Sequence, residues 1–223
     1  IALTPSLSLP AIGLGTWKLS QAEAAGALAS AIELGYRHLD CAPIYMNEKA
    51  VGQGIRNGLQ HTGLQREDLW IPSKLWNSFH FPEHVMPALK ETLHFMQLDY
   101  LDLYLMHWPV ATQHRCGHNR PESGDDFIAL NDCPLNDTWE ALEACQQAGL
   151  TRSIGTANFS ANKLTSLLTQ ARIRPVVNQV ECHPHLTQPQ LMQFCQDQHI
   201  HVTAYASLGS GDRPTIIKNE NEF

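Results

Sequence analysis

Short apolar runs alternate with amphipathic stretches along the whole chain. The apolar runs have the length of buried strands, and the amphipathic stretches carry apolar residues at helical spacing. Strands are expected near residues 11–15, 37–41, 70–74, 101–106, 153–156, 176–180 and 202–206. Helices are expected after Ser20, from about Glu48, from about Glu83, from Asp137, after Ser160 and from about Gln188. This alternation predicts an α/β protein whose parallel strands are joined by crossover helices.

The order of these elements predicts one domain over residues 1–223, an incomplete (β/α)8 TIM barrel. A closed barrel needs one more strand and two more helices than the pattern provides. The residues after Leu208 are too few and too polar to form them, so the last helix, strand and helix are expected to be missing from the chain. Such an open barrel leaves two sheet edges unpaired.

One connection is much longer than the others. Residues 110–136 are polar, rich in His, Gly, Asn and Asp, and show little periodicity. Unstructured connections of this length are usually binding loops or lids, so we expect a lid-like loop here. His114, Arg115 and His118 lie in it and are interpreted as part of a solvated face rather than as substrate contacts.

Composition excludes several classes of protein. A net charge of −7 argues against a nucleic-acid partner, because such proteins usually carry a basic face. No apolar stretch is long enough for a membrane span, and the first residues do not resemble a signal peptide, so a cytoplasmic location is expected. The six cysteines are irregularly spaced and predict reduced thiols. Cys116 with His118, and Cys182 with His183, lack a matching second pair, so no metal site is expected.

Polar side chains recur at the ends of successive expected strands, namely Asp40, Tyr45, Lys74 and His107. A nearby ammonium lowers the pKa of a tyrosine from about 10, and a carboxylate would keep that ammonium charged. A histidine beside them would donate a hydrogen bond to a substrate oxygen. Each residue alone has a structural explanation, as a helix cap, an ion pair, a rim aromatic or a core histidine. All four together favour a site that protonates an oxygen gaining negative charge, which suits carbonyl reduction.

Longer motifs around these residues resemble the aldo-keto reductase family. The run from Gly35 to Ala42, followed by Tyr45 and the pair Asn47–Glu48, resembles the family signature. Further similar stretches span the chain in order, at residues 12–17, 73–76, 103–109, 158–159, 178–184 and 205–209. The resemblance implies a monomeric β/α barrel that reduces aldehydes and ketones with NADPH. It also implies that Tyr45 is the general acid, that Asp40 and Lys74 tune it, and that His107 orients the carbonyl.

The resemblance also implies binding residues. Tyr205 would stack on the nicotinamide, and Asn158 and Gln179 would bind its carboxamide, although either amide could equally satisfy loop backbone. The cofactor-binding residues expected are Gly15, Thr16, Trp17, Asp40, Asn158, Gln179, Tyr205, Ser207, Leu208, Ser210 and Asp212. The substrate-binding residues expected are Trp17, Tyr45, Trp76, His107 and Trp108. Gly13 is expected on the same first loop, facing the cofactor or the substrate.

Two features depart from the family pattern. Ala157 stands where the family commonly has serine, which removes one hydrogen bond to the carboxamide. The family's basic motif for the adenosine 2′-phosphate lies on the eighth strand and the helix after it, beyond the last residue here. A non-catalytic or truncated relative, acting as a binding or regulatory protein, is therefore the alternative hypothesis. An isomerase or aldolase with Lys74 as Schiff base is disfavoured, because Asp40 would keep that lysine charged.

Overall fold

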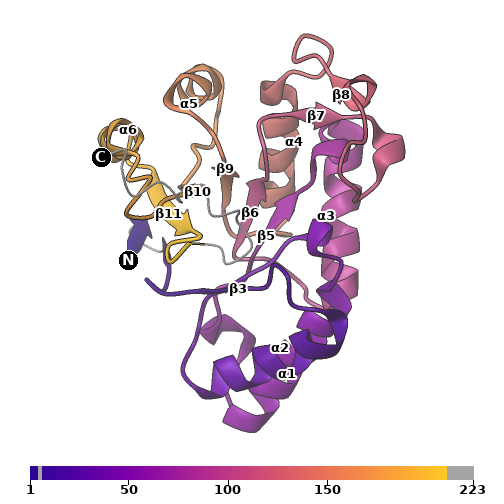
Figure 1. Ribbon diagram of the computed structural model, residues 1–223, viewed down its shortest axis with the longest axis vertical. Coiled ribbons are helices and arrows are strands. Elements are labelled where there is room, and N and C mark those ends of the chain that lie inside the picture. Colours follow the sequence, from indigo (N-terminus) through magenta and orange to yellow (C-terminus); the bar gives the residue numbers. More distant parts are fainter. Residues whose placement is uncertain (5–6, 210–223) are drawn as a thin grey trace, which may run out of the picture.

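A curved parallel sheet forms the centre of the computed structural model, which describes residues 1–4 and 7–209 (Figure 1). The strand order of this sheet is β11-β10-β9-β6-β5. Its strands are β5 (Pro72–Leu75), β6 (Leu103–Met106), β9 (Ile154–Ala157), β10 (Val177–Glu181) and β11 (His201–Tyr205). Beyond β5 the curve continues through β4 (Leu39–Asp40) to β3 (Leu14–Gly15). Two main-chain hydrogen bonds join β4 to the β5 segment, Leu39 N to Trp70 O at 3.0 Å and Cys41 N to Pro72 O at 3.1 Å.

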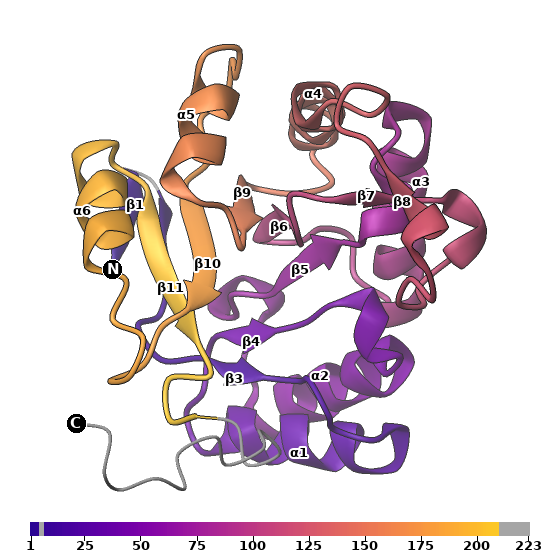
Figure 2. The same ribbon diagram turned by 45° about the horizontal axis from the view of Figure 1, so that its top comes forward.

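Helices alternate with these strands and lie around the outside of the sheet (Figure 2). They are α1 (Gln21–Glu33), α2 (Glu48–Thr62), α3 (Pro82–Met96), α4 (Leu135–Gln147), α5 (Ala161–Leu168) and α6 (Pro189–Asp197). Two short 3-10 helices follow strands directly, η1 (Pro43–Tyr45) after β4 and η3 (Asn77–Phe79) after β5. The predicted fold class, a β/α barrel with a parallel sheet, is confirmed. Strands β3 and β11 end the array, and within residues 1–4 and 7–209 no main-chain hydrogen bond joins them.

Helices α1 and α5 start at the capping residues that the sequence predicts. Ser20 N donates to Glu23 Oε2 at 3.1 Å, and Glu23 N donates to Ser20 Oγ at 3.3 Å, which is the predicted capping box of α1. Ser160 caps α5 by accepting from Lys163 N at 3.4 Å. Local sequence therefore determines where these helices begin, before any tertiary contact is considered.

Several short elements were not expected. Residues 110–136 contain an antiparallel pair, β7 (Ala111–Thr112) with β8 (Phe127–Ile128). A second pair, β1 (Ala2–Thr4) with β2 (Leu7–Ser8), precedes the barrel. The first barrel strand covers only Leu14–Gly15, not residues 11–15. Two-residue strands are too short for an alternating pattern, so periodicity along the chain cannot reveal them.

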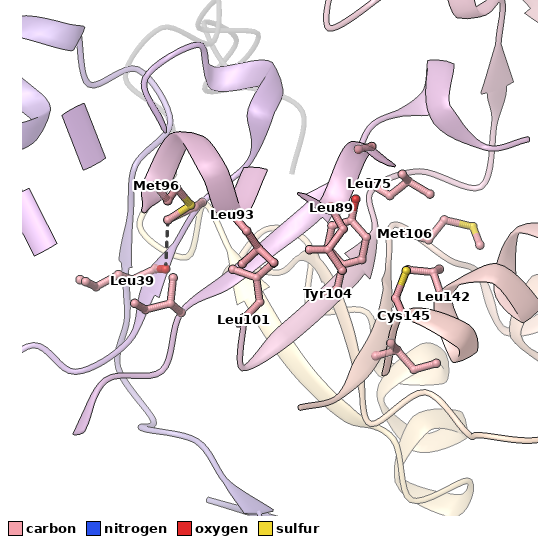
Figure 3. Close-up of a cluster of buried hydrophobic side chains, with 14 of the residues drawn as sticks. Leu39, Leu75, Leu89, Leu93, Met96, Leu101, Tyr104, Met106, Leu142 and Cys145 are labelled. Carbon is pink, nitrogen blue, oxygen red and sulfur yellow. Dashed lines mark hydrogen bonds between the residues drawn. The ribbon is translucent and has the colours of Figure 1, made fainter. Parts of the chain in front are cut away.

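The central strands β5, β6 and β9 bury both of their faces. On β6, Leu103 and Leu105 point into a small cluster inside the barrel, whereas Tyr104 and Met106 join the main core. Figure 3 shows that main core between the strands and helices α3 and α4. Burial of each such leucine stabilises the fold by about 1.5–3 kcal/mol. Because side chains alternate between the faces, the next residue, His107, projects to the inner side at the carboxyl end of β6.

Candidate active site

A cleft of ≈ 1110 Å³ opens at the carboxyl ends of the barrel strands. The predicted site residues that line it are Gly15, Trp17, Asp40, Tyr45, Trp76, His107, Trp108, Asn158, Gln179 and Tyr205. These residues come from segments far apart in the sequence. Parallel strands bring them together because their carboxyl ends meet at one face of a barrel.

Lys74 does not line the cleft, but it is the centre of a polar network behind Asp40 and Tyr45, which do. Its side chain is almost fully buried, and Nζ donates to Asp40 Oδ2 at 2.6 Å, to Cys41 O at 3.0 Å and to Tyr45 Oη at 3.2 Å. Burial opposes the positive charge, but the Asp40 carboxylate and the Tyr45 oxygen outweigh it and raise the pKa of Lys74. Lys74 is therefore a fixed cation, which rules against its use as a neutral amine nucleophile.

The pKa of Tyr45 differs from the value expected from the sequence. Burial raises the pKa of Tyr45, and the opposing effect of Lys74 is smaller and is further offset by Asp40. The expectation that the ammonium lowers this pKa below 10 is therefore wrong as a net direction, although Lys74 acts with the expected sign. Because Lys74 donates to the phenol oxygen, the Tyr45 hydrogen is free to donate to a ligand. Tyr45 is thus a protonated hydrogen-bond donor at neutral pH.

His107 lies beside Tyr45 at the carboxyl end of β6. The ring centroids are 6.2 Å apart and nearly perpendicular, and Trp76 packs edge-on at 5.2 Å. Burial, with Lys74 and His80 adding to it, holds the pKa of His107 well below 6.5. A neutral imidazole still has one N–H to donate. Tyr45 and His107 therefore offer two donors for one ligand oxygen.

Two amide side chains, Asn158 and Gln179, also line the cleft. Asn158 follows β9 with a φ of 62°, a left-handed turn that asparagine tolerates. Its Nδ2 donates to His107 O at 2.8 Å, and its Oδ1 accepts from Tyr205 Oη at 2.9 Å. Gln179 Nε2 donates to Asp40 Oδ1 at 2.7 Å. The second N–H of Asn158 and the Oε1 of Gln179 have no hydrogen bond to the described residues.

Three tryptophans border the cleft, and they differ in exposure. Trp17 and Trp108 are 48% and 39% exposed, whereas Trp76 is 6% exposed. The Trp76 Nε1 donates to Asn119 O at 2.9 Å, which attaches the long loop to the end of β5. Trp76 therefore both lines the cleft and holds the loop.

Some expected binding residues lie elsewhere. Thr16 is fully buried, and its Oγ1 donates to Asp40 O at 2.9 Å, so it supports the site from behind. Ser207 Oγ donates to Ala204 O at 3.4 Å, and Leu208 is fully exposed, and neither lines the cleft. Ser210 and Asp212 lie outside the described residues.

Gly13 does not face the cleft as expected. A Cβ on Gly13 would lie 2.8 Å from Cγ of the His38 ring. The glycine therefore permits close packing of the first segment against β4 rather than approach of a ligand.

The long loop is attached to the barrel rather than freely solvated. His114 stacks on His84 of α3 at 3.8 Å, and His118 stacks on Phe79 of η3 at 4.7 Å. Arg115 pairs with Asp126 at 2.8 Å within the loop. His114 and Arg115 are nevertheless exposed, as the expected solvated face requires, whereas His118 is half-buried.

Sequence reasoning also missed part of the lining. The additional residues are Lys18, Ile44, Asn77, Val110, Arg120, Pro121, Phe127, Glu181, Ala206 and Gly209. Several of them lie in residues 110–136. The unusual length of this loop is the feature of the sequence that could have indicated their role in the cleft.

His80 is a buried histidine that the sequence did not distinguish. It is 1% exposed, and within the described ranges neither ring nitrogen has a hydrogen-bond partner. Burial lowers the pKa of His80 to about 3. The folded protein therefore keeps His80 neutral at pH values where the unfolded chain, with a histidine pKa of about 6.5, binds a proton.

We expect His80 to make the protein sensitive to acid. Its contribution to the free energy of unfolding falls by about 1.4 kcal/mol per pH unit as pH drops from about 6.5 towards 3. In His80→Leu, the slope of stability between pH 6 and 4 should decrease by about that amount in urea titrations. The exposed His185→Leu is the matched control and should keep the wild-type slope. An unchanged slope in His80→Leu would contradict the expectation.

In the part of the chain that the structure describes, none of the helices has the length and hydrophobicity of a membrane span. Nor does that part contain a group of three or more His, Cys, Asp or Glu side chains that could hold a metal ion.

Comparison with known proteins agrees with this geometry. The Aldo/keto reductase family model matches residues 11–221. An aldo/keto reductase of Synechocystis sp. is 50% identical over 96% of this chain and 65% of its own length. Aldo-keto reductase family 1 member A1 of Sus scrofa is 44% identical over 99% of this chain and 68% of its own length. The chain thus spans about two thirds of the length of these relatives.

Solved structures give the same result. The aldose reductase of Schistosoma japonicum superposes with a TM-score of 0.85 at 41% identity, covering 90% of this chain and 66% of that one. An aldo-keto reductase of Bombyx mori, solved in complex with NADP, superposes with a TM-score of 0.82 at 38% identity, covering 96% of this chain and 70% of that one. The sequence match, the fold and the arrangement of the cleft lead to one conclusion: the chain belongs to the aldo/keto reductase family.

Proposed function

We propose that the protein is an NADPH-dependent oxidoreductase that reduces aldehydes and ketones to alcohols. The observation that carries the proposal is the contact of Lys74 Nζ with both Asp40 and Tyr45 on the floor of the cleft. A buried cation held against a protonated phenol stabilises the negative charge that remains when the phenol gives up its proton. This arrangement suits the protonation of a carbonyl oxygen during reduction.

Each residue of the site has its own role in this mechanism. Tyr45 and His107 donate hydrogen bonds to the carbonyl oxygen, which fixes its orientation and polarises the bond. Tyr45 then transfers its proton to that oxygen as negative charge develops. Lys74 stabilises the resulting phenolate, and Asp40 holds Lys74 charged and in position. The raised pKa of Tyr45 keeps its proton available throughout the neutral range.

The residues present fit a nicotinamide cofactor. A carboxamide has both an N–H donor and an oxygen acceptor, and the wall formed by Asn158 and Gln179 retains an N–H and an oxygen to match them. Tyr205 lies beside this wall and supplies an aromatic ring. Asp40 also lines the cleft and accepts a hydrogen bond from Gln179. When bound, the cofactor supplies the hydride, and the protein provides orientation and the proton.

The comparisons support this choice of cofactor and reaction. The Bombyx mori relative was solved with NADP, and the Schistosoma japonicum neighbour is named an aldose reductase. A preference for NADPH over NADH is part of the proposal, and so is a monomeric state in solution.

The direct test is loss of NADPH absorbance at 340 nm when an aromatic aldehyde is added to the protein. Reduction that depends on both the protein and the aldehyde would support the oxidoreductase. Absence of turnover with a panel of aromatic and aliphatic aldehydes would favour the alternative, a non-catalytic binding or regulatory relative. Replacing NADPH by NADH in the same assay tests the cofactor preference.

Ala157 offers a separate test of the cofactor wall. It lies at the end of β9, is almost fully buried and pairs in register with Gln179. Ala157→Ser adds a hydroxyl that would donate to the carboxamide, and one such bond contributes about 0.5–1.5 kcal/mol. We therefore expect Ala157→Ser to lower the cofactor Kd about 2- to 10-fold in a fluorescence titration. Ala157→Cys, which adds similar volume but a weak donor, is the control, and equal affinity of Ala157→Ser and wild type would contradict the idea.

A further inference from the structure

Arg120 lines the cleft from the loop between β7 and β8. Within residues 1–4 and 7–209, every other arginine has a carboxylate, carbonyl or amide partner in the protein: Arg37, Arg56, Arg66, Arg115, Arg152, Arg172 and Arg174. Arg120 has no such partner in the same part of the chain. A guanidinium remains charged at all relevant pH values. The cleft therefore contains a cation that is available to a ligand.

The main chain on both sides of Arg120 is held in place. Before it, Asn119 O accepts from Trp76 Nε1 at 2.9 Å. After it, Glu122 N donates to Asp126 Oδ2 at 2.8 Å. The backbone therefore presents Arg120 from a defined position, which lowers the entropy cost of binding a ligand there.

The charge of the cleft favours an anion, although the chain as a whole carries a net charge of −7. Among the described residues, the acidic side chains that line the cleft, Asp40 and Glu181, are already engaged. Asp40 Oδ2 lies 2.6 Å from Lys74 Nζ, and Glu181 Oε1 lies 2.8 Å from His183 Nε2. Arg120 therefore adds a positive charge that neither of these two carboxylates neutralises.

We propose that Arg120 binds an anionic group of the substrate, and that the preferred substrates are carbonyl compounds carrying a carboxylate. This inference rests on the proposed function of the cleft, in which Tyr45 and His107 bind the carbonyl oxygen. The planar guanidinium matches a carboxylate through two parallel N–H···O bonds. The aromatic side chains of Trp76 and Phe127 also line the cleft and provide apolar contact for the part of the substrate between its two polar ends.

The position of Arg120 distinguishes the substrate from the cofactor as its ligand. The amides that fit a nicotinamide, Asn158 and Gln179, lie at the ends of β9 and β10. Arg120 extends from a different segment, which is attached to the end of β5 through Trp76. We therefore expect Arg120 to affect the KM for the aldehyde and not the KM for NADPH.

The test compares 4-carboxybenzaldehyde with 4-formylbenzamide, which has nearly the same shape and no charge. The measured quantity is the ratio of kcat/KM for the acid to kcat/KM for the amide. Arg120→Ala should lower this ratio on the order of tenfold, mainly through the KM for the acid, because the guanidinium is exposed and its interaction is partly screened. Arg120→Lys should restore part of the ratio. In the wild type the ratio should also fall as ionic strength rises.

Arg172→Ala is the matched control for the loss of one positive charge. Arg172 lies outside the cleft, is 73% exposed and pairs with Glu140 at 3.0 Å. Its removal should leave the acid-to-amide ratio at the wild-type value. An equal fall of the ratio in Arg172→Ala and Arg120→Ala would assign the effect to overall charge and overturn the proposal.

A binding measurement separates this inference from the proposed function. Trp17 and Trp108 border the cleft, so quenching of tryptophan fluorescence can report the Kd of 4-carboxybenzaldehyde without turnover. A Kd that rises about tenfold in Arg120→Ala supports the anion site even if neither probe is reduced, in which case the reductase proposal fails alone. If both probes are reduced while the ratio and the Kd are unchanged in Arg120→Ala, the anion site is wrong and the reductase stands.

Discussion

Tyr45→Phe should lower kcat for aldehyde reduction by about 10²–10⁴-fold, the usual contribution of a positioned general acid. The variant removes the proton donor and keeps the ring. Lys74 and His107 remain in place, so the cleft should still bind substrate. The measurement is NADPH oxidation under steady-state conditions, together with the Kd of the aldehyde from tryptophan fluorescence. A large fall in kcat at nearly constant Kd is the expected result.

Tyr36→Phe is the matched control, because Tyr36 packs against the main core, outside the cleft. It should keep wild-type turnover. Retention of wild-type turnover in Tyr45→Phe would reject Tyr45 as the acid.

The pH profile gives a second measurement on the same group. A general acid must be protonated to act, and burial raises the pKa of Tyr45 above 10. The kcat/KM of the wild type should therefore show no loss from Tyr45 ionisation between pH 7 and 9. A loss of activity centred near pH 7 that disappears in Tyr45→Phe would contradict the raised pKa.

Asp40→Asn should lower the free energy of unfolding by about 3–5 kcal/mol, because it leaves the buried charge of Lys74 without a counter-charge. The Lys74 side chain is 1% exposed, so water cannot replace the lost partner. The measurement is urea unfolding followed by circular dichroism. Glu140→Gln, which breaks the exposed pair with Arg172, is the control and should cost less than about 1 kcal/mol.

The pKa of Lys74 also determines how the stability difference between Asp40→Asn and the wild type should change with pH. In the wild type the pKa of Lys74 is raised, so the stabilisation by the pair is fully present below the unfolded value of about 10.4 and is lost only above it. In Asp40→Asn the raising effect of Asp40 is lost and only Tyr45 still opposes burial, so the pKa of Lys74 should fall. The stability of the variant relative to the wild type should then recover as pH rises from about 7 to 10.

A double variant separates charge from packing. Asp40→Asn combined with Lys74→Met removes both charges and should regain much of the stability lost in Asp40→Asn. If the single and double variants are equally unstable, the pair stabilises the fold by shape rather than by charge.

Much of the architecture could be predicted from local sequence. The capping residues Ser20 and Ser160 begin their helices as expected, because a cap requires only a side chain and the backbone amides that follow it. The apolar run at residues 101–106 predicted a buried strand with His107 at its end. Short pairs such as β7 with β8 were missed, because two residues contain no period.

The sequence predicted which residues form the candidate site, but it did not predict the pKa of Tyr45. Asp40, Tyr45 and Lys74 were expected together, and hydrogen bonds from Lys74 join them. The net direction of the Tyr45 pKa was wrong, because it depends on how burial compares with the charges of Lys74 and Asp40. Burial is a property of the assembled protein and has no counterpart in the spacing of residues.

The sequence by itself determined the alternation of strands and helices, the helix caps and the gathering of Asp40, Tyr45, Lys74 and His107 at one end of the barrel. These features follow from side-chain periodicity and from the parallel direction of the strands, which are local properties. Only the tertiary structure decided that Tyr45 is held protonated and that Arg120 alone among the described arginines is unpaired at the cleft. Both outcomes depend on which charges and how much water surround a group, and those surroundings come from segments distant in the chain.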